Sequence, residues 1–210
     1  MLTRVPPDAV TIDAFGTLVT LADPVDALVD ALAAHGVERS RTQVADAFRA
    51  EVAYYVPRSH EGRDEATLAL LRQDCARVFL DAADARDLDA AEFAPAFVAA
   101  LEFEPVAGAV EACEALSHRR VPVAVVSNWD IGLKEYVRRL GLSLPVITSA
   151  EAGAPKPDPR IFRLALERLG SVAPERAVHV GDSAADEEGA RAAGMRFHPA
   201  PLAAAVEELL

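Results

Sequence analysis

The second half of the chain alternates short apolar runs with helical stripes, and this alternation constrains the fold most. β-Branched, apolar runs after Pro105 predict strands over residues 121–126, 146–148, 177–180 and 195–198. Apolar residues at helical spacing predict helices around them, over residues 106–116, 133–140, 158–169, 184–193 and 202–209. Strands and helices that alternate in this way predict a parallel sheet covered by helices on both faces.

A further buried strand is predicted at residues 10–12, and it ends directly at the carboxylate of Asp13. In open α/β sheets, ligands bind beyond the carboxyl ends of the strands. Polar residues follow the other predicted strands too, and all of them are expected at the same edge of the sheet. They are Ser127 with Asn128, Lys156 in a proline-rich loop, and Asp182 with Asp186.

Residues 21–101 separate this first strand from its predicted partners and contain no strand-like run. Their apolar stripes predict four packed helices, with a polar loop over residues 58–63 between the second and the third. We therefore predict an α/β fold: a Rossmann-like parallel sheet built from residues 1–20 and 102–210, with an all-helical insert over residues 21–101.

Composition excludes several classes of partner. The net charge of −12 disfavours nucleic acid, whose phosphates attract basic surfaces, but it permits a small anionic substrate held by local positive charge. No apolar run is long enough to span a membrane, and residues 1–10 lack the apolar core of a signal peptide. Cys75 and Cys113 lie on apolar stripes and are expected as buried residues in a reducing compartment. We expect a cytoplasmic monomer or homodimer.

Taken together and in order, the polar motifs resemble those of the haloacid dehalogenase-like hydrolase superfamily, in its helical-cap branch. Asp13-Ala14-Phe15-Gly16-Thr17 is similar to the first motif, which begins with the nucleophile, and Ser127 to the phosphate-binding second motif. Lys156-Pro157-Asp158-Pro159 is similar to the third motif, and the segment from Gly181 to Asp186 to the acidic fourth. The resemblance covers nearly the whole chain, and it implies that residues 21–101 are the cap.

The resemblance implies a Mg²⁺-dependent phosphatase that forms an aspartyl-phosphate on Asp13. Asp13, Asp182, Asp186 and the backbone carbonyl of Phe15 would hold the ion. Lys156 would supply fixed positive charge, while Ser127 and the N–H groups from Asn128 onward would bind the phosphoryl group. Physical chemistry agrees, because three clustered carboxylates raise one another's pKa values unless a hard cation offsets their charge.

The chain departs from the phosphatase pattern at Phe15, where such members carry a second Asp that protonates the leaving group. Phenylalanine cannot transfer a proton, and general acid–base help is worth about 10² to 10⁴ in rate. Asp130 and His60 are candidate substitutes. The sequence favours the plainer interpretation of Asp130, as the N-cap of the next helix.

An aromatic residue at this position also resembles the 2-haloacid dehalogenases, which need neither a metal nor a leaving-group proton. Those members use an arginine about thirty residues after the nucleophile, and Arg39 and Arg41 lie near that spacing. Asp182 argues against this alternative, because a carboxylate repels halide. A third alternative is a binding protein that has lost catalysis, but the retained charges disfavour it. The sequence therefore favours the phosphatase.

Several further residues are candidates for substrate contact. Tyr55, Arg58, His60 and Arg63 concentrate aromatic and polar groups where the second and third helices of the insert join, and the arginines could meet an anionic substrate. Trp129 follows Ser127 and Asn128, and it either lines the site or packs beneath the loop. His179 interrupts an apolar run and is expected to be a buried histidine with satisfied hydrogen bonds rather than a ligand.

Overall fold

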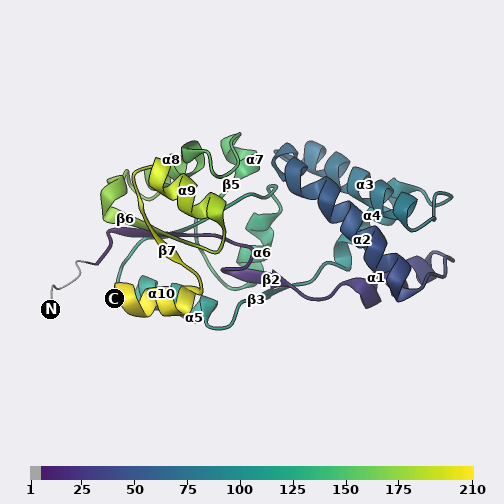
Figure 1. Ribbon diagram of the computed structural model, residues 1–210, viewed down its shortest axis with the longest axis horizontal. Coiled ribbons are helices and arrows are strands. Elements are labelled where there is room, and N and C mark those ends of the chain that lie inside the picture. Colours follow the sequence, from purple (N-terminus) through teal and green to yellow (C-terminus); the bar gives the residue numbers. More distant parts are fainter. Residues whose placement is uncertain (1–5) are drawn as a thin grey trace. The chain divides into compact units, whose positions relative to one another are not determined.

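The structure is a computed structural model that describes residues 6–210 (Figure 1). Its described residues divide into two compact units, one of residues 6–20 and 104–210 and the other of residues 21–103. Residues 1–5, which belong to the predicted segment 1–20 and to the predicted absence of a signal peptide, lie outside the described residues. We call the first of the two units the α/β unit and the second the helical unit.

A parallel sheet forms the centre of the α/β unit. Across residues 6–210 it has five strands in the order β5-β4-β1-β6-β7. Their bounds are β1 (Ala9–Ile12), β4 (Val123–Ser127), β5 (Val146–Thr148), β6 (Ala177–Gly181) and β7 (Arg196–Pro199). All the neighbouring pairs run parallel, which confirms the predicted α/β class. The strand predicted from residue 121 begins later, because the Val121 N–H donates to Leu116 and closes the preceding helix.

Helices cover both faces of this sheet, as the alternation predicts. Helices α8 (Pro159–Arg168) and α9 (Ala184–Ala192) pack together against one face, and α5 (Ala109–His118) and α10 (Leu202–Leu209) pair on the other (Figure 1). Strands β1, β4 and β6 are buried along their whole length, which explains why they read as continuous apolar runs. The remaining helical segments are α6 (Leu133–Arg139), α7 (Ser149–Ala152) and η2 (Pro174–Arg176).

Two short strands mark the places where the chain passes between the units. Strand β2 (Val19–Leu21) pairs with β3 (Phe103–Pro105) in a separate two-stranded sheet. The sequence does not predict either strand, because three residues are too few to establish a period of two.

The helical unit contains α1 (Val25–Ala34), α2 (Arg41–Tyr55), η1 (Val56–Glu61), α3 (Glu65–Ala82) and α4 (Ala90–Ala99). The predicted polar loop over residues 58–63 is wrong for its first part, which is the 3-10 helix η1. Pro57 does not stop the chain's helical path, because it stands in the first turn of η1, where its missing N–H costs no hydrogen bond.

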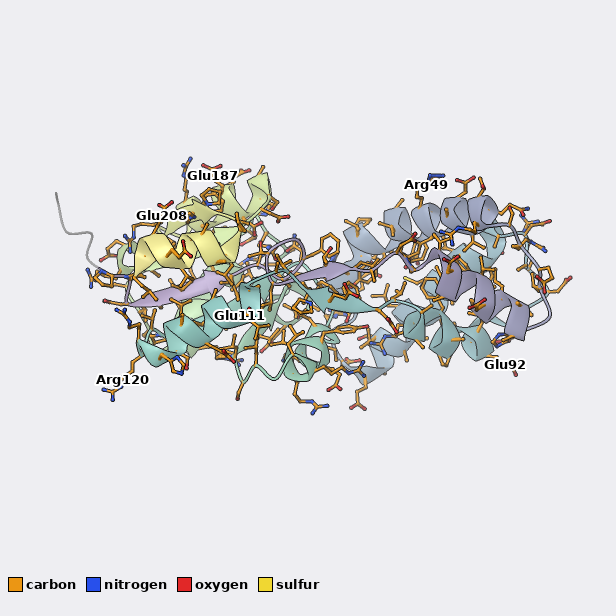
Figure 2. All side chains as sticks on the ribbon, turned by 90° about the horizontal axis from the view of Figure 1, so that it is seen from below. Arg49, Glu92, Glu111, Arg120, Glu187 and Glu208 are labelled. Carbon is orange, nitrogen blue, oxygen red and sulfur yellow. The ribbon has the colours of Figure 1, made fainter. Side chains whose placement is uncertain are left out.

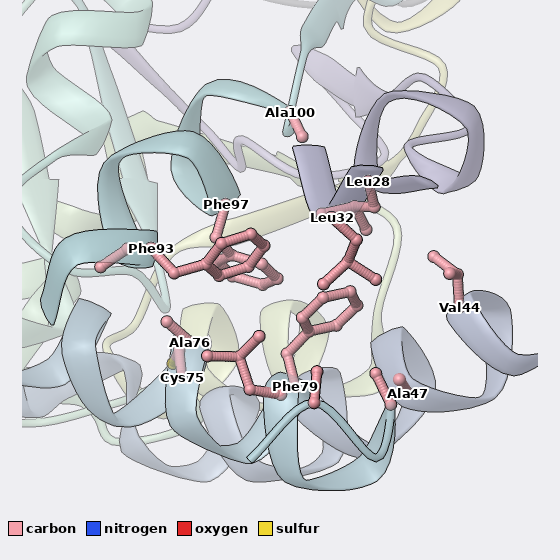
Figure 3. Close-up of a cluster of buried hydrophobic side chains, with 14 of the residues drawn as sticks. Leu28, Leu32, Val44, Ala47, Cys75, Ala76, Phe79, Phe93, Phe97 and Ala100 are labelled. Carbon is pink, nitrogen blue, oxygen red and sulfur yellow. The ribbon is translucent and has the colours of Figure 1, made fainter. Parts of the chain in front are cut away.

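Aromatic rings pack among aliphatic side chains in the core of the helical unit (Figure 3). Phe79 stacks on Phe93 with centroids 6.0 Å apart, and it meets Phe97 at 5.1 Å. Cys75 is buried in this core, and Cys113 is buried in the α/β unit, as their apolar stripes predict. Charged side chains such as Arg49 and Glu92 point outward (Figure 2). Among residues 6–210, no helix has the length and apolar character needed to cross a membrane.

Candidate active site

The carboxyl ends of three adjacent strands meet at one edge of the sheet. Asp13 follows the central strand β1, Ser127 ends β4 on one side, and Asp182 follows β6 on the other. Asp186 lies in the first turn of α9, four residues after Asp182. One carboxylate oxygen from each of Asp13, Asp182 and Asp186 lies within 4.8 Å of the other two.

Lys156 supplies positive charge to this cluster from the loop before α8. Its side chain is 3% exposed, and its Nζ donates to Asp13 Oδ1 at 2.6 Å and to Asp186 Oδ1 at 2.5 Å. Burial by itself would lower the pKa of Lys156, but the two carboxylates outweigh burial and raise that pKa above its ordinary value. Lys156 is therefore a fixed cation bridging two acids.

Asn128 fixes the backbone of Lys156. Its amide Nδ2 donates to the Lys156 carbonyl at 3.1 Å, and its Oδ1 accepts from the Lys156 N–H at 2.6 Å. These paired contacts tie the loop after β4 to the loop that carries the lysine. Asn128 therefore holds the backbone of Lys156 in place.

Glycines make room for the acidic side chains. A Cβ on Gly16 would come within 2.0 Å of Asp182 Oδ2, and a Cβ on Gly181 within 2.5 Å of the Asp186 carboxyl carbon. Gly16 also has a φ of +80°, a conformation that other residues adopt at a cost. Both positions accept only glycine without displacing a carboxylate.

Asp186 is completely buried, and four donors surround its carboxylate. Lys156 Nζ and His179 Nε2 reach Oδ1, while the N–H and hydroxyl of Ser183 reach Oδ2. Burial alone would raise the pKa of Asp186, but His179 and Lys156 more than offset it and lower that pKa. The carboxylate is therefore held ionised although it is buried.

Asp182 is exposed, and its surroundings act in the opposite direction. Partial burial, followed by the negative charges of Asp13 and Asp186, raises the pKa of Asp182 above its ordinary value. A bound cation would relieve this repulsion.

This donor set fits a hard divalent cation. Around Mg²⁺, oxygen ligands at about 2.1 Å from the metal stand about 3 to 4.2 Å from one another. The observed limit of 4.8 Å between the oxygens of Asp13, Asp182 and Asp186 requires only small adjustments to reach that spacing.

The structure bears on three further residues near the cluster, and for Asp130 it corrects the prediction. Asp130 is not the N-cap of α6: its Oδ1 accepts from the Gly132 N–H at 2.7 Å within the preceding turn, and Gly132 is the N-cap. Trp129 is buried, with its ring 6.2 Å from that of Tyr136, so it packs beneath the loop. Phe15, in contrast, is 51% exposed, and its side chain carries no titratable group.

The remaining predicted residues lie in the helical unit. The Arg58 guanidinium lies 4.2 Å from the centre of the Tyr54 ring and donates to the Tyr54 carbonyl at 3.0 Å. Tyr55 ends α2, His60 lies in η1, and Arg63 is exposed just after it.

The two arginines predicted for the dehalogenase alternative are both engaged inside the helical unit. Arg39 donates to the carbonyls of Ala83 and Asp84 at 2.6 Å and 2.5 Å. Arg41 forms ion pairs with Asp23 and Asp26.

The fold and the acidic strand ends define an α/β core with a parallel sheet, interrupted in sequence by a helical segment. The sequence model of the haloacid dehalogenase-like hydrolases matches residues 7–194, so the chain belongs to this family of hydrolases.

Curated relatives match only part of the chain. Haloacid dehalogenase-like hydrolase domain-containing protein 3 of Mus musculus is 42% identical over 103 residues, which is 47% of this chain and 41% of that protein. A phosphoserine phosphatase of Thermus thermophilus is 56% identical over 52 residues, 24% of this chain and 20% of the relative. The chain thus spans less than half the length of these relatives.

Among solved structures, the defluorinating L-2-haloacid dehalogenase Rha0230 superposes with a TM-score of 0.73, covering 98% of both chains. Its sequence identity of 21% makes this a likeness of fold.

Proposed function

We propose that this hydrolase is a Mg²⁺-dependent phosphatase that acts on a small phosphorylated metabolite through an aspartyl-phosphate on Asp13. The observation that carries the proposal is the cluster of Asp13, Asp182 and Asp186 around one point, beside the buried cation Lys156. Three carboxylates in one place attract a divalent cation, whereas a halide-releasing site gains nothing from them.

Asp13 is the nucleophile in this proposal. Its Oδ1 accepts from Lys156, so we assign the attack on phosphorus to Oδ2. A bond forms between Oδ2 and phosphorus while the bond from phosphorus to the leaving oxygen breaks. Water then attacks the aspartyl-phosphate, which releases inorganic phosphate and restores the carboxylate.

Positive charge must offset the approach of two anions. Two unit charges about 4 Å apart repel by about 4 kcal/mol at an intermediate effective dielectric. Lys156 supplies one fixed positive charge at Asp13, and Ser127 donates a hydrogen bond to a phosphoryl oxygen. Mg²⁺ would be held by Asp13, Asp182, Asp186 and the Phe15 carbonyl, and it would supply Lewis-acid stabilisation of the phosphoryl charge.

The direct test compares metal-dependent phosphate release with chloride release. Hydrolysis of para-nitrophenyl phosphate is measured with Mg²⁺ and with EDTA, beside chloride release from 2-chloropropionate. We expect phosphate release that requires Mg²⁺ and disappears in Asp13→Asn. Chloride release that persists in EDTA would overturn the proposal.

Phe15 implies a preference for substrates whose leaving group needs no proton. The aryl leaving group of para-nitrophenyl phosphate departs unprotonated, so the absent acid does not hide activity. We expect Phe15→Asp to raise the rate on alkyl phosphates by about 10² or more, because it restores a proton donor at the exposed position 15. Phe15→Asn is the matched control and should bring no such gain.

The dehalogenase alternative rests on the same residue. A halide leaves carbon without being protonated, so this reaction needs no proton donor at the position of Phe15. Its predicted arginines are Arg39 and Arg41. Arg39 is bonded to backbone carbonyls and Arg41 to carboxylates, and these contacts disfavour the alternative.

We further propose that Arg58 meets an anionic group of the substrate. The Tyr54 ring and carbonyl preorganise its guanidinium. Arg58→Met should raise KM about tenfold with little change in kcat, as expected for uniform binding. Arg49→Met, at an exposed pair with Asp46, is the control. An unchanged KM in Arg58→Met would exclude this role.

A further inference from the structure

A polar pair crosses the otherwise apolar centre of the sheet, and the proposed chemistry gives it no role. Thr11 on β1 stands opposite His179 on β6 in the parallel register, and both side chains are completely buried. Thr11 Oγ1 lies 2.8 Å from His179 Nδ1, and His179 Nε2 lies 3.0 Å from Asp186 Oδ1. The imidazole therefore connects the middle of the sheet to the acidic cluster.

The chemistry of the partners fixes the direction of these hydrogen bonds. An ionised carboxylate only accepts, so we assign the ring hydrogen on Nε2 to the bond with Asp186. The Thr11 hydroxyl can donate, so it gives its hydrogen to Nδ1. Thr11 thereby selects the tautomer that serves Asp186.

Packing fixes the plane of the imidazole ring as well. Phe162 meets it edge-on, with centroids 4.9 Å apart and planes at 85°, and Phe197 lies 6.4 Å away on β7. Gly189 allows this arrangement, because a Cβ there would come within 2.5 Å of the Phe162 ring. The ring cannot turn without disturbing the core between α8, α9 and the sheet.

We propose that His179 is a positioning residue that orients Asp186, and through Asp186 the ammonium of Lys156, at the nucleophile. This inference rests on the proposed function of Asp13. Hydrogen bonds run continuously from Thr11 through His179, Asp186 and Lys156 to Asp13. The hydrogen bonds of His179 go to Thr11 and Asp186, so it acts on the nucleophile through the carboxylate of Asp186.

His179 is needed because its Nε2 donates to the Asp186 oxygen that also binds Lys156. Ser183 holds Asp186 Oδ2 from the same helix, whereas Oδ1 meets only Lys156 and His179 among the described residues. Without the imidazole, Oδ1 has a single partner, and the carboxylate can turn with the lysine away from Asp13. Loss of a hydrogen bond to a side chain that ligates a metal typically costs about 10- to 100-fold in metal affinity or activity.

The test compares three variants. His179→Phe keeps a ring of similar shape and removes both hydrogen bonds. His179→Gln keeps an amide donor that can reach Asp186, and Thr11→Val removes only the hydrogen bond on the far side of the ring. Isothermal titration with Mg²⁺ alone gives the metal affinity of each protein, and steady-state assays on para-nitrophenyl phosphate give kcat and KM.

We expect His179→Phe to weaken Mg²⁺ binding and to lower kcat by about 10- to 100-fold, with KM changed less. His179→Gln should recover most of this loss, and Thr11→Val should lie between His179→Phe and the unaltered protein. A purely structural role would lower the stability of all three variants while leaving the Mg²⁺ affinity and kcat of the folded fraction unchanged, and that result would overturn the inference.

The unaltered protein separates this failure from a failure of the proposed function. If it neither binds Mg²⁺ nor releases phosphate, the proposed function is wrong and the inference falls with it. If it does both and His179→Phe matches it, only the inference is wrong.

Discussion

Glu51 in the helical unit and Asp186 in the α/β unit are both buried acids, yet their surroundings shift their pKa values in opposite directions. Glu51 is 4% exposed and Asp186 is fully buried. Burial, only partly offset by a hydrogen bond from Cys75, raises the pKa of Glu51 to about 7. Hydrogen bonds and charge from His179 and Lys156 overcome burial and lower the pKa of Asp186.

The difference teaches that burial does not determine the charge of an acid, whereas the surrounding donors do. In the helical unit, burial outweighs the hydrogen bond from Cys75, so a large share of the Glu51 carboxyl groups keeps its proton near pH 7. In the α/β unit, a buried lysine and a buried histidine keep Asp186 ionised. Removing one charge from such a buried cluster destabilises the fold. Buried charges with shifted pKa values are typical of functional sites.

The largest expected effect comes from removing the central cation. Lys156→Met removes the cation that bridges the buried carboxylates of Asp13 and Asp186, and breaking a buried ion pair in this way costs about 3 to 5 kcal/mol. Urea unfolding followed by the fluorescence of Trp129, the sole tryptophan of the sequence, reports on the α/β unit. Lys134→Met, at a more exposed pair with Glu151, is the control and should cost less than about 1 kcal/mol. Equal costs in both variants would contradict the comparison.

The second prediction concerns Glu51 and the pH dependence of stability. Its pKa is raised from 4.5 to about 7 on folding, so between these values the unfolded chain is ionised while the folded chain keeps the proton. Stability from this group is therefore complete below about pH 4.5, falls as the pH rises to about 7, and stays low above it. The total loss is about 3 kcal/mol at 1.36 kcal/mol per pKa unit.

Glu51→Gln cannot ionise, so it should be more stable than the unaltered protein at pH 8, by up to about 3 kcal/mol. The gain should vanish near pH 4. Far-ultraviolet circular dichroism during urea unfolding at both pH values measures it, with the exposed Glu92→Gln as the control. A gain that is the same at both pH values would show that ionisation of Glu51 has no part in it.

Mg²⁺ should stabilise the α/β unit by binding to its acidic cluster, and this effect should be somewhat smaller than that of Glu51→Gln. At a hundred times its Kd, a ligand that binds only the folded state adds about 2.7 kcal/mol to the free energy of unfolding. We expect this gain, measured by Trp129 fluorescence, to be lost in Asp182→Asn, because Asp182 is the exposed carboxylate of the cluster. A gain that survives in Asp182→Asn would place the ion elsewhere.

The sequence predicts the sheet and its acidic edge because strong local signals carry them. Apolar, β-branched runs locate the strands, and chain order alone brings Asp13, Lys156 and Asp182 to the same edge, where the structure finds them. Helix periodicity likewise predicts four helices in the insert, which are α1 to α4 among the described residues.

What the sequence does not predict depends on contacts distant along the chain. The bond between Thr11 and His179 joins residues 168 positions apart, and only the register of β1 against β6 brings them together. A signal was nevertheless present, because each is a polar residue inside an apolar strand and buried polar groups need partners. The engagement of Arg39 with the end of α3 depends similarly on packing that no local pattern shows.

The smallest expected effect compares two equivalent helix starts. Ser40 begins α2 in the helical unit and Ser183 begins α9 in the α/β unit, each in a capping box with the residue three positions later. Replacing either serine by alanine should cost about 1 kcal/mol of stability. Ser40→Ala should leave the turnover of para-nitrophenyl phosphate unchanged, since its partner Gln43 only closes the helix. Ser183→Ala should also lower kcat, because the partner there is Asp186, whose Oδ2 loses a donor. Equal stability losses with unequal turnover would separate a cap that only begins a helix from one that also holds the acidic cluster, whereas equal turnover in both variants would mean that Asp186 does not need Ser183.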